Sequence, residues 1–174
     1  MKKLEIITAL LVVLAVPAMA RAERIQATLT GFEEVPAVST DAKGQFRGTI
    51  SRDENTIDYE LTYSGLQGTV QQAHIHVAQL SVNGSIVIWL CQTPTGTTPF
   101  VDPTGLAPQC PQEGTVKGTI TEKNVIAGAT TSQQLAAGEL DEVIAAIRAG
   151  AAYANVHTDL SPGGEIRGQI RARR

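Results

Sequence analysis

The sequence is poor in aromatic and sulfur-containing residues. Phe, Trp and Tyr make up 4% of its 174 residues, and there are two methionines and two cysteines. Met1 and Met19 both lie in an N-terminal segment that we expect to be removed, so the mature chain contains no methionine. This excludes a blue-copper site with an axial methionine. The hydrophobic core must be built mainly from Ile, Val, Leu and Ala.

Long apolar runs are also missing after the first 20 residues. Lys2 and Lys3 precede the run "IITALLVVLAVPAMA" (residues 6–20), which is typical of a secretory signal peptide. Small residues offer cleavage points after Ala20 or Ala22, and we expect a signal peptide of residues 1–22 and one domain of residues 23–174. The run is short for a membrane span, although an uncleaved anchor is the alternative interpretation. We therefore predict a periplasmic or secreted protein without a membrane span after cleavage.

Positive charge is scarce in the mature chain. Removal of residues 1–22 takes away three basic residues and one acidic residue, which changes the formal net charge from −3 to −5. Binding to nucleic acid phosphates requires a basic surface. We therefore expect no nucleic acid partner.

The two cysteines, Cys91 and Cys110, flank the segment "QTPTGTTPFVDPTGLAPQ", which has no periodicity. Cysteines of an exported protein are normally oxidised, so we predict a disulfide between them. Closing a loop of this length stabilises a fold by roughly 3 kcal/mol. A pair of thiolate metal ligands is the alternative, but the cysteines lack the close spacing of zinc motifs.

Most of the mature chain alternates between apolar and polar residues, with turn residues between the alternating segments. This pattern is typical of short antiparallel strands. One segment, "GELDEVIAAIRAG" (138–150), instead has apolar residues at helical spacing, with acids in its first turn and Gly150 after it. The expected class is all-β, an immunoglobulin-like or Greek-key β-sandwich with one short helix. Strands are predicted at 24–30, 44–51, 55–63, 70–79, 84–91, 115–121, 152–158 and 164–171.

The chain has only three histidines, and all of them lie on predicted strands. His74 and His76 are two residues apart, so their side chains project from the same face of a strand. On this strand we expect only the opposite face, with Ala73 and Ile75, to be buried. The same parity places His157 on the outer face of its own strand. If the two strands are neighbours, the three imidazoles converge into a metal site with three nitrogen ligands.

Three segments together resemble the CHRD domain, a module found in chordin and in exported bacterial proteins: "LTGFEEVPAV" (29–38), "LTYSGLQGTVQQAHIHVA" (61–78) and "AAYANVHTDLSPGGEIRGQI" (151–170). The resemblance covers nearly all of the mature chain and implies an immunoglobulin-like sandwich. Ala37 stands where the family often has a second proline, and the insert between the cysteines is longer than in the minimal domain. The family resemblance indicates the fold more than the activity.

A second resemblance concerns chemistry. The "HIH" and "NVHT" strands are similar in order and residue type to the copper-ligand strands of copper/zinc superoxide dismutases. This resemblance implies that His74, His76 and His157 are copper ligands. The chain has no fourth histidine to bridge two metals and no histidine-rich zinc loop, which excludes a two-metal site.

Strand parity also suggests residues around the metal. Asn155 shares the face of His157, while Glu165 and Arg167 share a face of the last strand. Glu165 is a candidate acceptor for the second ring nitrogen of a metal-bound histidine. Arg167 is a candidate catalytic residue that attracts a small anion toward the metal. A surface ion pair of little energetic value is the alternative role for Glu165 and Arg167.

These observations support one main hypothesis and two alternatives. The main hypothesis is an exported domain that binds one copper ion through the three histidines and has superoxide dismutase-like or other redox activity on a small substrate such as superoxide. One alternative is an extracellular interaction module without metal, in which the histidines only form hydrogen bonds. The other is a mononuclear zinc enzyme with the same three ligands and an activated water.

Overall fold

A computed structural model of the chain describes residues 22–94 and 101–173. The predicted signal peptide lies outside the described residues except for Ala22, and so does part of the segment between the cysteines. No helix among the described residues is long and apolar enough to span a membrane.

Four neighbouring antiparallel strands form a regular part of the sheet in which one face is buried and the other is exposed. They are β1 (Glu23–Thr30), β2 (Lys43–Ile50), β3 (Ile57–Ser64) and β6 (Gly114–Ile120). Along β1 and β3, buried residues alternate with exposed or partly exposed ones, as the sequence pattern predicts. The inner face of these four strands therefore supplies one half of the core.

The remaining strands are β4 (Val70–Val77), β5 (Ser85–Gln92), β7 (Ala152–Thr158), β8 (Ile166–Gln169) and β9 (Arg171–Arg173). In contrast to the four strands above, β7 and β8 are buried at every position, and β4 is buried at all positions except Val77. The polar residues at alternate positions of these strands are therefore buried as well as the apolar ones. The expectation that only one face of the 70–77 strand is buried is wrong.

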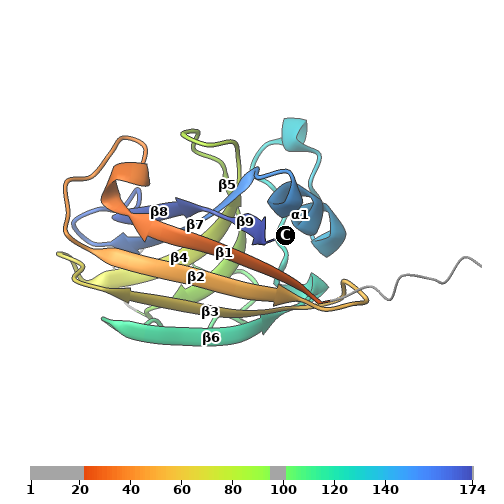
Figure 1. Ribbon diagram of the computed structural model, residues 1–174, viewed down its shortest axis with the longest axis horizontal. Coiled ribbons are helices and arrows are strands. Elements are labelled where there is room, and N and C mark those ends of the chain that lie inside the picture. The colour runs from red at the N-terminus through yellow and green to blue at the C-terminus, as the bar shows by residue number, and fades with distance from the viewer. Residues whose placement is uncertain (1–21, 95–100, 174) are drawn as a thin grey trace, which may run out of the picture.

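The nine strands of the described residues belong to one hydrogen-bonded sheet with the order β5-β4-β7-β8-β1-β2-β3-β6, and β9 pairs with β1. The sheet curls so that β5 and β6, its two end strands, come into contact (Figure 1). The apolar inner face encloses the core, which includes Phe46, Leu61 and Ile75. The structure confirms the all-β class with one short helix, in the form of a single nearly closed sheet.

The predicted helix is α1 (Leu140–Arg148), which buries Leu140, Val143, Ile144 and Ile147. It packs against β7 and β9 at one end of the sheet (Figure 1). Three short 3₁₀ helices lie in connections: η1 (Gly31–Glu33), η2 (Glu122–Asn124) and η3 (Thr131–Gln133). The helix therefore closes one end of the core, as its amphipathic pattern indicates.

The predicted disulfide between Cys91 and Cys110 is confirmed. It joins the end of β5 to the segment that precedes β6, and both cysteines are buried. The backbone of Gln92 adds two hydrogen bonds to this segment, to Pro108 and Cys110. The insert is therefore anchored at the edge of the sheet.

Candidate metal centre

The register of β4 against β7 brings the three histidines together. The strands are antiparallel neighbours, with Gln72 opposite His157 and His74 opposite Asn155. The ring centroid of His74 lies 5.4 Å from that of His76 and 4.8 Å from that of His157. One candidate ligand atom from each histidine can be chosen so that all three lie within 4.8 Å of one another. Among the described residues, no other group of three or more His, Cys, Asp or Glu side chains shows this proximity.

Backbone carbonyls set the orientation of two rings. His76 Nδ1 lies 3.0 Å from the carbonyl oxygen of Gly84, and His157 Nδ1 lies 2.9 Å from that of Pro162. Because a carbonyl only accepts, Nδ1 carries the proton in both neutral rings and Nε2 keeps its lone pair. Donation of the second ring nitrogen to a carbonyl is the arrangement expected around metal-binding histidines.

The third ring completes the set of donors. His74 Nδ1 lies 3.2 Å from His157 Nε2. Ligands held at about 2.0 Å from one ion in tetrahedral geometry are about 3.3 Å apart, so this spacing matches two nitrogens that face the same metal. The Nε2 atoms of His74 and His76 are buried without a hydrogen-bond partner. The site therefore offers nitrogen atoms that no protein group satisfies.

Burial keeps the three imidazoles neutral. The exposed fraction is 0% for His74 and 6% for both His76 and His157. Desolvation lowers the pKa of His74 well below its usual value, and the neighbouring His157 and His76 lower it further. Desolvation also lowers the pKa of His76 to about 3 and that of His157 to about 4. All three side chains are therefore uncharged at neutral pH and able to bind a metal.

These pKa values predict that the metal-free protein is less stable in mild acid. The unfolded chain takes up protons on His76 and His157 below pH 6.5, whereas the folded protein does not until about pH 4, so stability present above pH 6.5 is lost as the pH falls toward 4. Burial raises the pKa of Glu34 to about 7, which acts in the opposite direction but involves one group against three. We expect urea unfolding to show a loss of at least about 3 kcal/mol between pH 7 and 4.5.

A His76→Gln/His157→Gln variant serves as the control for this pH dependence, because it should lose much less stability over the same interval. A stability of the metal-free wild type that does not fall between pH 6.5 and 5 would contradict the prediction.

The ring of His76 is supported by Tyr153, which in turn stacks against Arg167. The Tyr153 ring lies parallel to it, with 4.6 Å between centroids and an angle of 2°. The guanidinium carbon of Arg167 lies 3.4 Å from the Tyr153 centroid, in cation–π geometry. Arg167 also donates hydrogen bonds to the carbonyl of Val82 (2.9 Å) and to Asn83 Oδ1 (3.2 Å). The predicted candidate for anion attraction is thus buried and engaged in hydrogen bonds with the β4–β5 loop.

Glu165 lies in a different network from the histidines. Its carboxylate accepts hydrogen bonds from the Thr40 and Thr158 hydroxyls and from the backbone amides of Gln67 and Gly68. No hydrogen bond between Glu165 and a histidine occurs in the described parts of the chain, and Glu165 forms no ion pair with Arg167 there. Both residues are buried, so the alternative of a surface ion pair is wrong. The carboxylate joins three loops beside the candidate metal centre.

The neighbours of Asn155 include a residue that strand parity alone does not identify. Asn155 lies beside His76 and Glu34, and its amide influences the pKa of both. Glu34 follows η1 and is 5% exposed, with one carboxylate oxygen unpaired. Its neighbour Glu33 is exposed. The segment around Glu34 thus folds over the face on which the histidines lie.

The histidines lie in a buried polar layer on the outer face of the sheet, separate from the apolar core. Seven side-chain polar atoms in the described residues are buried without a hydrogen-bond partner, and all of them lie on β4, β5, β7, β8 or just after η1. They belong to Glu34, Gln72, His74, His76, Trp89, Asn155 and Gln169. Trp89 is packed edge-on against His74, with 4.3 Å between ring centroids. Sequence parity identified His74, His76 and Asn155, and it also places Tyr153 on the face of His157. Nothing in the sequence indicated the contribution of Trp89.

A curled antiparallel sheet with three buried, neutral histidines on its outer face defines an all-β domain with a candidate mononuclear metal centre. The family model described as CHRD domain matches residues 25–170, and the chain therefore belongs to the CHRD domain family. Searches of curated proteins and of solved structures gave no match.

Proposed function

We propose that this CHRD domain protein binds one copper ion through His74, His76 and His157. The observation that carries the proposal is the convergence of three neutral, buried imidazoles within 4.8 Å, with Nδ1 of two rings donated to carbonyls. Unpaired nitrogens in a buried polar layer are costly unless something binds them. A metal ion held by His74 Nδ1 and His157 Nε2 would also satisfy the unpaired Nε2 of His76.

Copper is favoured over zinc by affinity and by charge. Copper leads the divalent series at nitrogen sites. Three neutral ligands can also hold singly charged Cu(I), because the cost of burying an ion rises with the square of its charge. Zinc hydrolases need a water at an open position. The low exposure of the rings limits access to the site to small molecules such as superoxide.

Redox activity is a second and more specific part of the proposal, beyond copper binding itself. Bound copper would supply a one-electron change between Cu(I) and Cu(II), which activity toward superoxide or another small substrate requires. The protein residues would hold the rings through Gly84 and Pro162 and would keep bulk water away. Superoxide turnover by the copper-loaded protein that is no faster than by the metal-free protein would leave copper binding without this activity.

The family and the disulfide support a place of action outside the cytoplasm. A CHRD domain suggests an extracellular binding module, and the disulfide fits an oxidising compartment. We propose export to the periplasm or the medium after removal of the predicted signal peptide. An interaction module without metal is the second candidate for the function.

The single tryptophan offers a direct test of copper binding. Because Trp89 lies against His74, Cu(II) at the site should quench most of the tryptophan emission, while Zn(II), whose d shell is filled, should change it little. We expect the quenching to reach a plateau at one equivalent of copper. Equilibrium dialysis with metal analysis should give the same stoichiometry. Absence of stoichiometric binding in both measurements would refute the proposal and favour the module without metal.

A further inference from the structure

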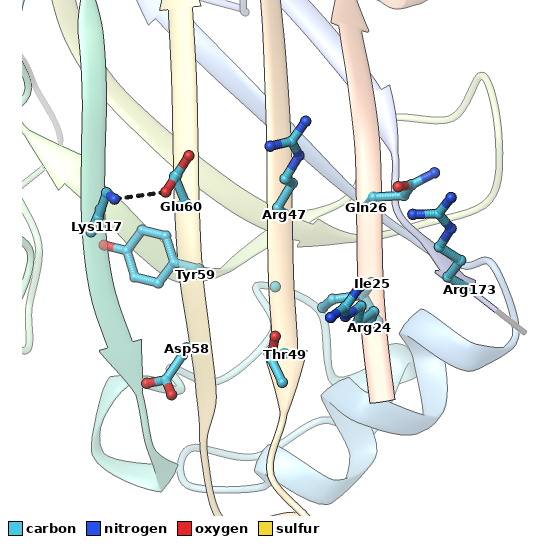
Figure 2. Close-up of a pocket in the computed structure, with 11 residues that line it drawn as sticks. Arg24, Ile25, Gln26, Arg47, Thr49, Asp58, Tyr59, Glu60, Lys117 and Arg173 are labelled. Carbon is cyan, nitrogen blue, oxygen red and sulfur yellow. Dashed lines mark ion pairs between the residues drawn. The ribbon is translucent and has the colours of Figure 1, made fainter. Parts of the chain in front are cut away.

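Three arginines gather on the outer face of the sheet, where β9, β1 and β2 run side by side. Arg24 of β1 lies directly opposite Arg173 of β9, and Arg47 of β2 lies opposite Gln26, the next outward residue of β1. The three arginines line one pocket over these strands, as Figure 2 shows. We call Arg24, Arg47 and Arg173 the arginine face. It shares no residue with the candidate metal centre.

The charge of the arginine face is only partly balanced. Arg47 lies directly opposite Glu60 of β3 and helps to lower its pKa, whereas Arg24 faces Arg173 and Thr49. In residues 22–94 and 101–173, no carboxylate forms an ion pair with any of the three arginines. The nearby Glu60 is paired with Lys117 at 2.8 Å (Figure 2). Asp58 accepts a hydrogen bond from Thr119. Like charges directly opposite across a sheet are destabilising. A local excess of positive charge in an acidic chain therefore indicates a surface that binds an anion.

The other features of the face indicate the chemical class of this anion. Gln26 and Thr49 place neutral hydrogen-bonding groups between the arginines. The only aromatic side chain of the pocket, Tyr59, is buried and donates to the Leu90 carbonyl, so the face offers no platform for stacking bases. The large exposed hydrophobic residues among those described all lie off these strands, which argues against insertion into a lipid surface. They are Phe32, Leu80, Val82, Val101, Leu106 and Leu160.

We propose that the arginine face binds an anionic polysaccharide. Sulfate or carboxylate groups along such a polymer would pair with the guanidinium groups, whose planar donors match these oxygens. The sugar hydroxyls would reach Gln26 and Thr49. A largely polar sheet face without a large exposed hydrophobic residue fits a hydrated, extended chain. This binding is independent of the metal and would hold the protein at a polymer outside the cell.

The test compares two double variants that lose the same charge. Arg24→Gln/Arg173→Gln changes the arginine face, and Arg52→Gln/Lys123→Gln removes two exposed basic residues from elsewhere. The probes are immobilised heparin and alginate, which carry sulfate and carboxylate groups. We expect wild type and the control to bind at least one probe at low ionic strength, with affinity that falls as salt is added. Arg24→Gln/Arg173→Gln should bind about tenfold more weakly or not at all.

Thermal unfolding gives a second signature. Because Arg24→Gln/Arg173→Gln removes a repulsive cross-strand pair, its Tm should equal or exceed that of wild type by about 1–2 °C, so weaker binding cannot be ascribed to misfolding. Failure of the wild type to bind either probe, or equal loss in both double variants, would overturn the proposal. Binding to phosphatidylglycerol vesicles but to neither polysaccharide would overturn it in favour of a lipid surface.

Discussion

Replacing His157 with alanine should weaken copper binding by more than about a hundredfold, because loss of a group that only orients a metal ligand already costs ten- to a hundredfold. His157 Nε2 lies 3.2 Å from His74 Nδ1, so the variant removes one of two adjacent donors and leaves at most two imidazoles. Competition with a chelator of known copper affinity measures the change, and Trp89 emission in the variant should not be quenched at one equivalent.

Gln72→Ala is the matched control for this experiment. Gln72 lies opposite His157 in the register of β4 and β7 and is buried in the same polar layer, but it is not one of the three histidines. The control should retain copper affinity within a few fold. His76→Gln keeps a side chain of similar length and tests the same site if His157→Ala does not fold. Retention of one tightly bound copper ion in both folded histidine variants would rule out the tri-histidine site.

Glu165→Ala should destabilise the fold by about 3–4 kcal/mol, the largest effect that we expect for a residue outside the metal centre. The buried carboxylate accepts four hydrogen bonds, including those from Thr40 and Thr158. Hydrogen bonds to charged groups are each worth about 1.5–3 kcal/mol, and their removal leaves buried donors unpaired. Urea unfolding with and without copper measures the effect, and copper affinity of the folded fraction should change far less than in His157→Ala.

Glu33→Ala is the control for this variant, because Glu33 is exposed and has no hydrogen bond through its side chain in the described structure. Its free energy of unfolding should stay within about 0.5 kcal/mol of the wild-type value. A loss from Glu165→Ala no larger than this would show that the network around the carboxylate contributes little.

Much of the framework could be predicted from alternation alone. The period of two in "AHIHV" placed His74 and His76 on one face, and the structure agrees because β4 pairs with β7 without a register shift at these positions. The pairing of β4 with β5 shifts register beside both histidines. The strand predicted at 152–158 coincides with β7, which made the approach of His157 predictable once the two strands were neighbours. The helix was visible because its four buried residues follow helical spacing. Local periodicity therefore suffices to predict those strands and helices whose structure depends on residues close in sequence.

The covering of the histidine face could not be predicted in this way. It depends on three loops that are distant in sequence, which bring Glu34, Asn83 and Pro162 over β4 and β7. Polar residues at alternate positions look like an exposed face, and only such long-range contacts bury them. The same cause explains Arg167, which looked like a surface charge but lies in contact with Tyr153 and the β4–β5 loop. The predicted last strand, 164–171, is likewise divided into β8 and β9 at Ile170.

The two carbonyls that hold His76 and His157 have a kinetic consequence. Because Gly84 and Pro162 fix the protonated nitrogen of each ring, an arriving ion would meet lone pairs that already point inward and would not have to wait for either ring to turn. The speed of metal uptake and release would then depend on how often the overlying loops open. Changes in those loops could alter exchange over a wide range while the equilibrium affinity stays nearly constant.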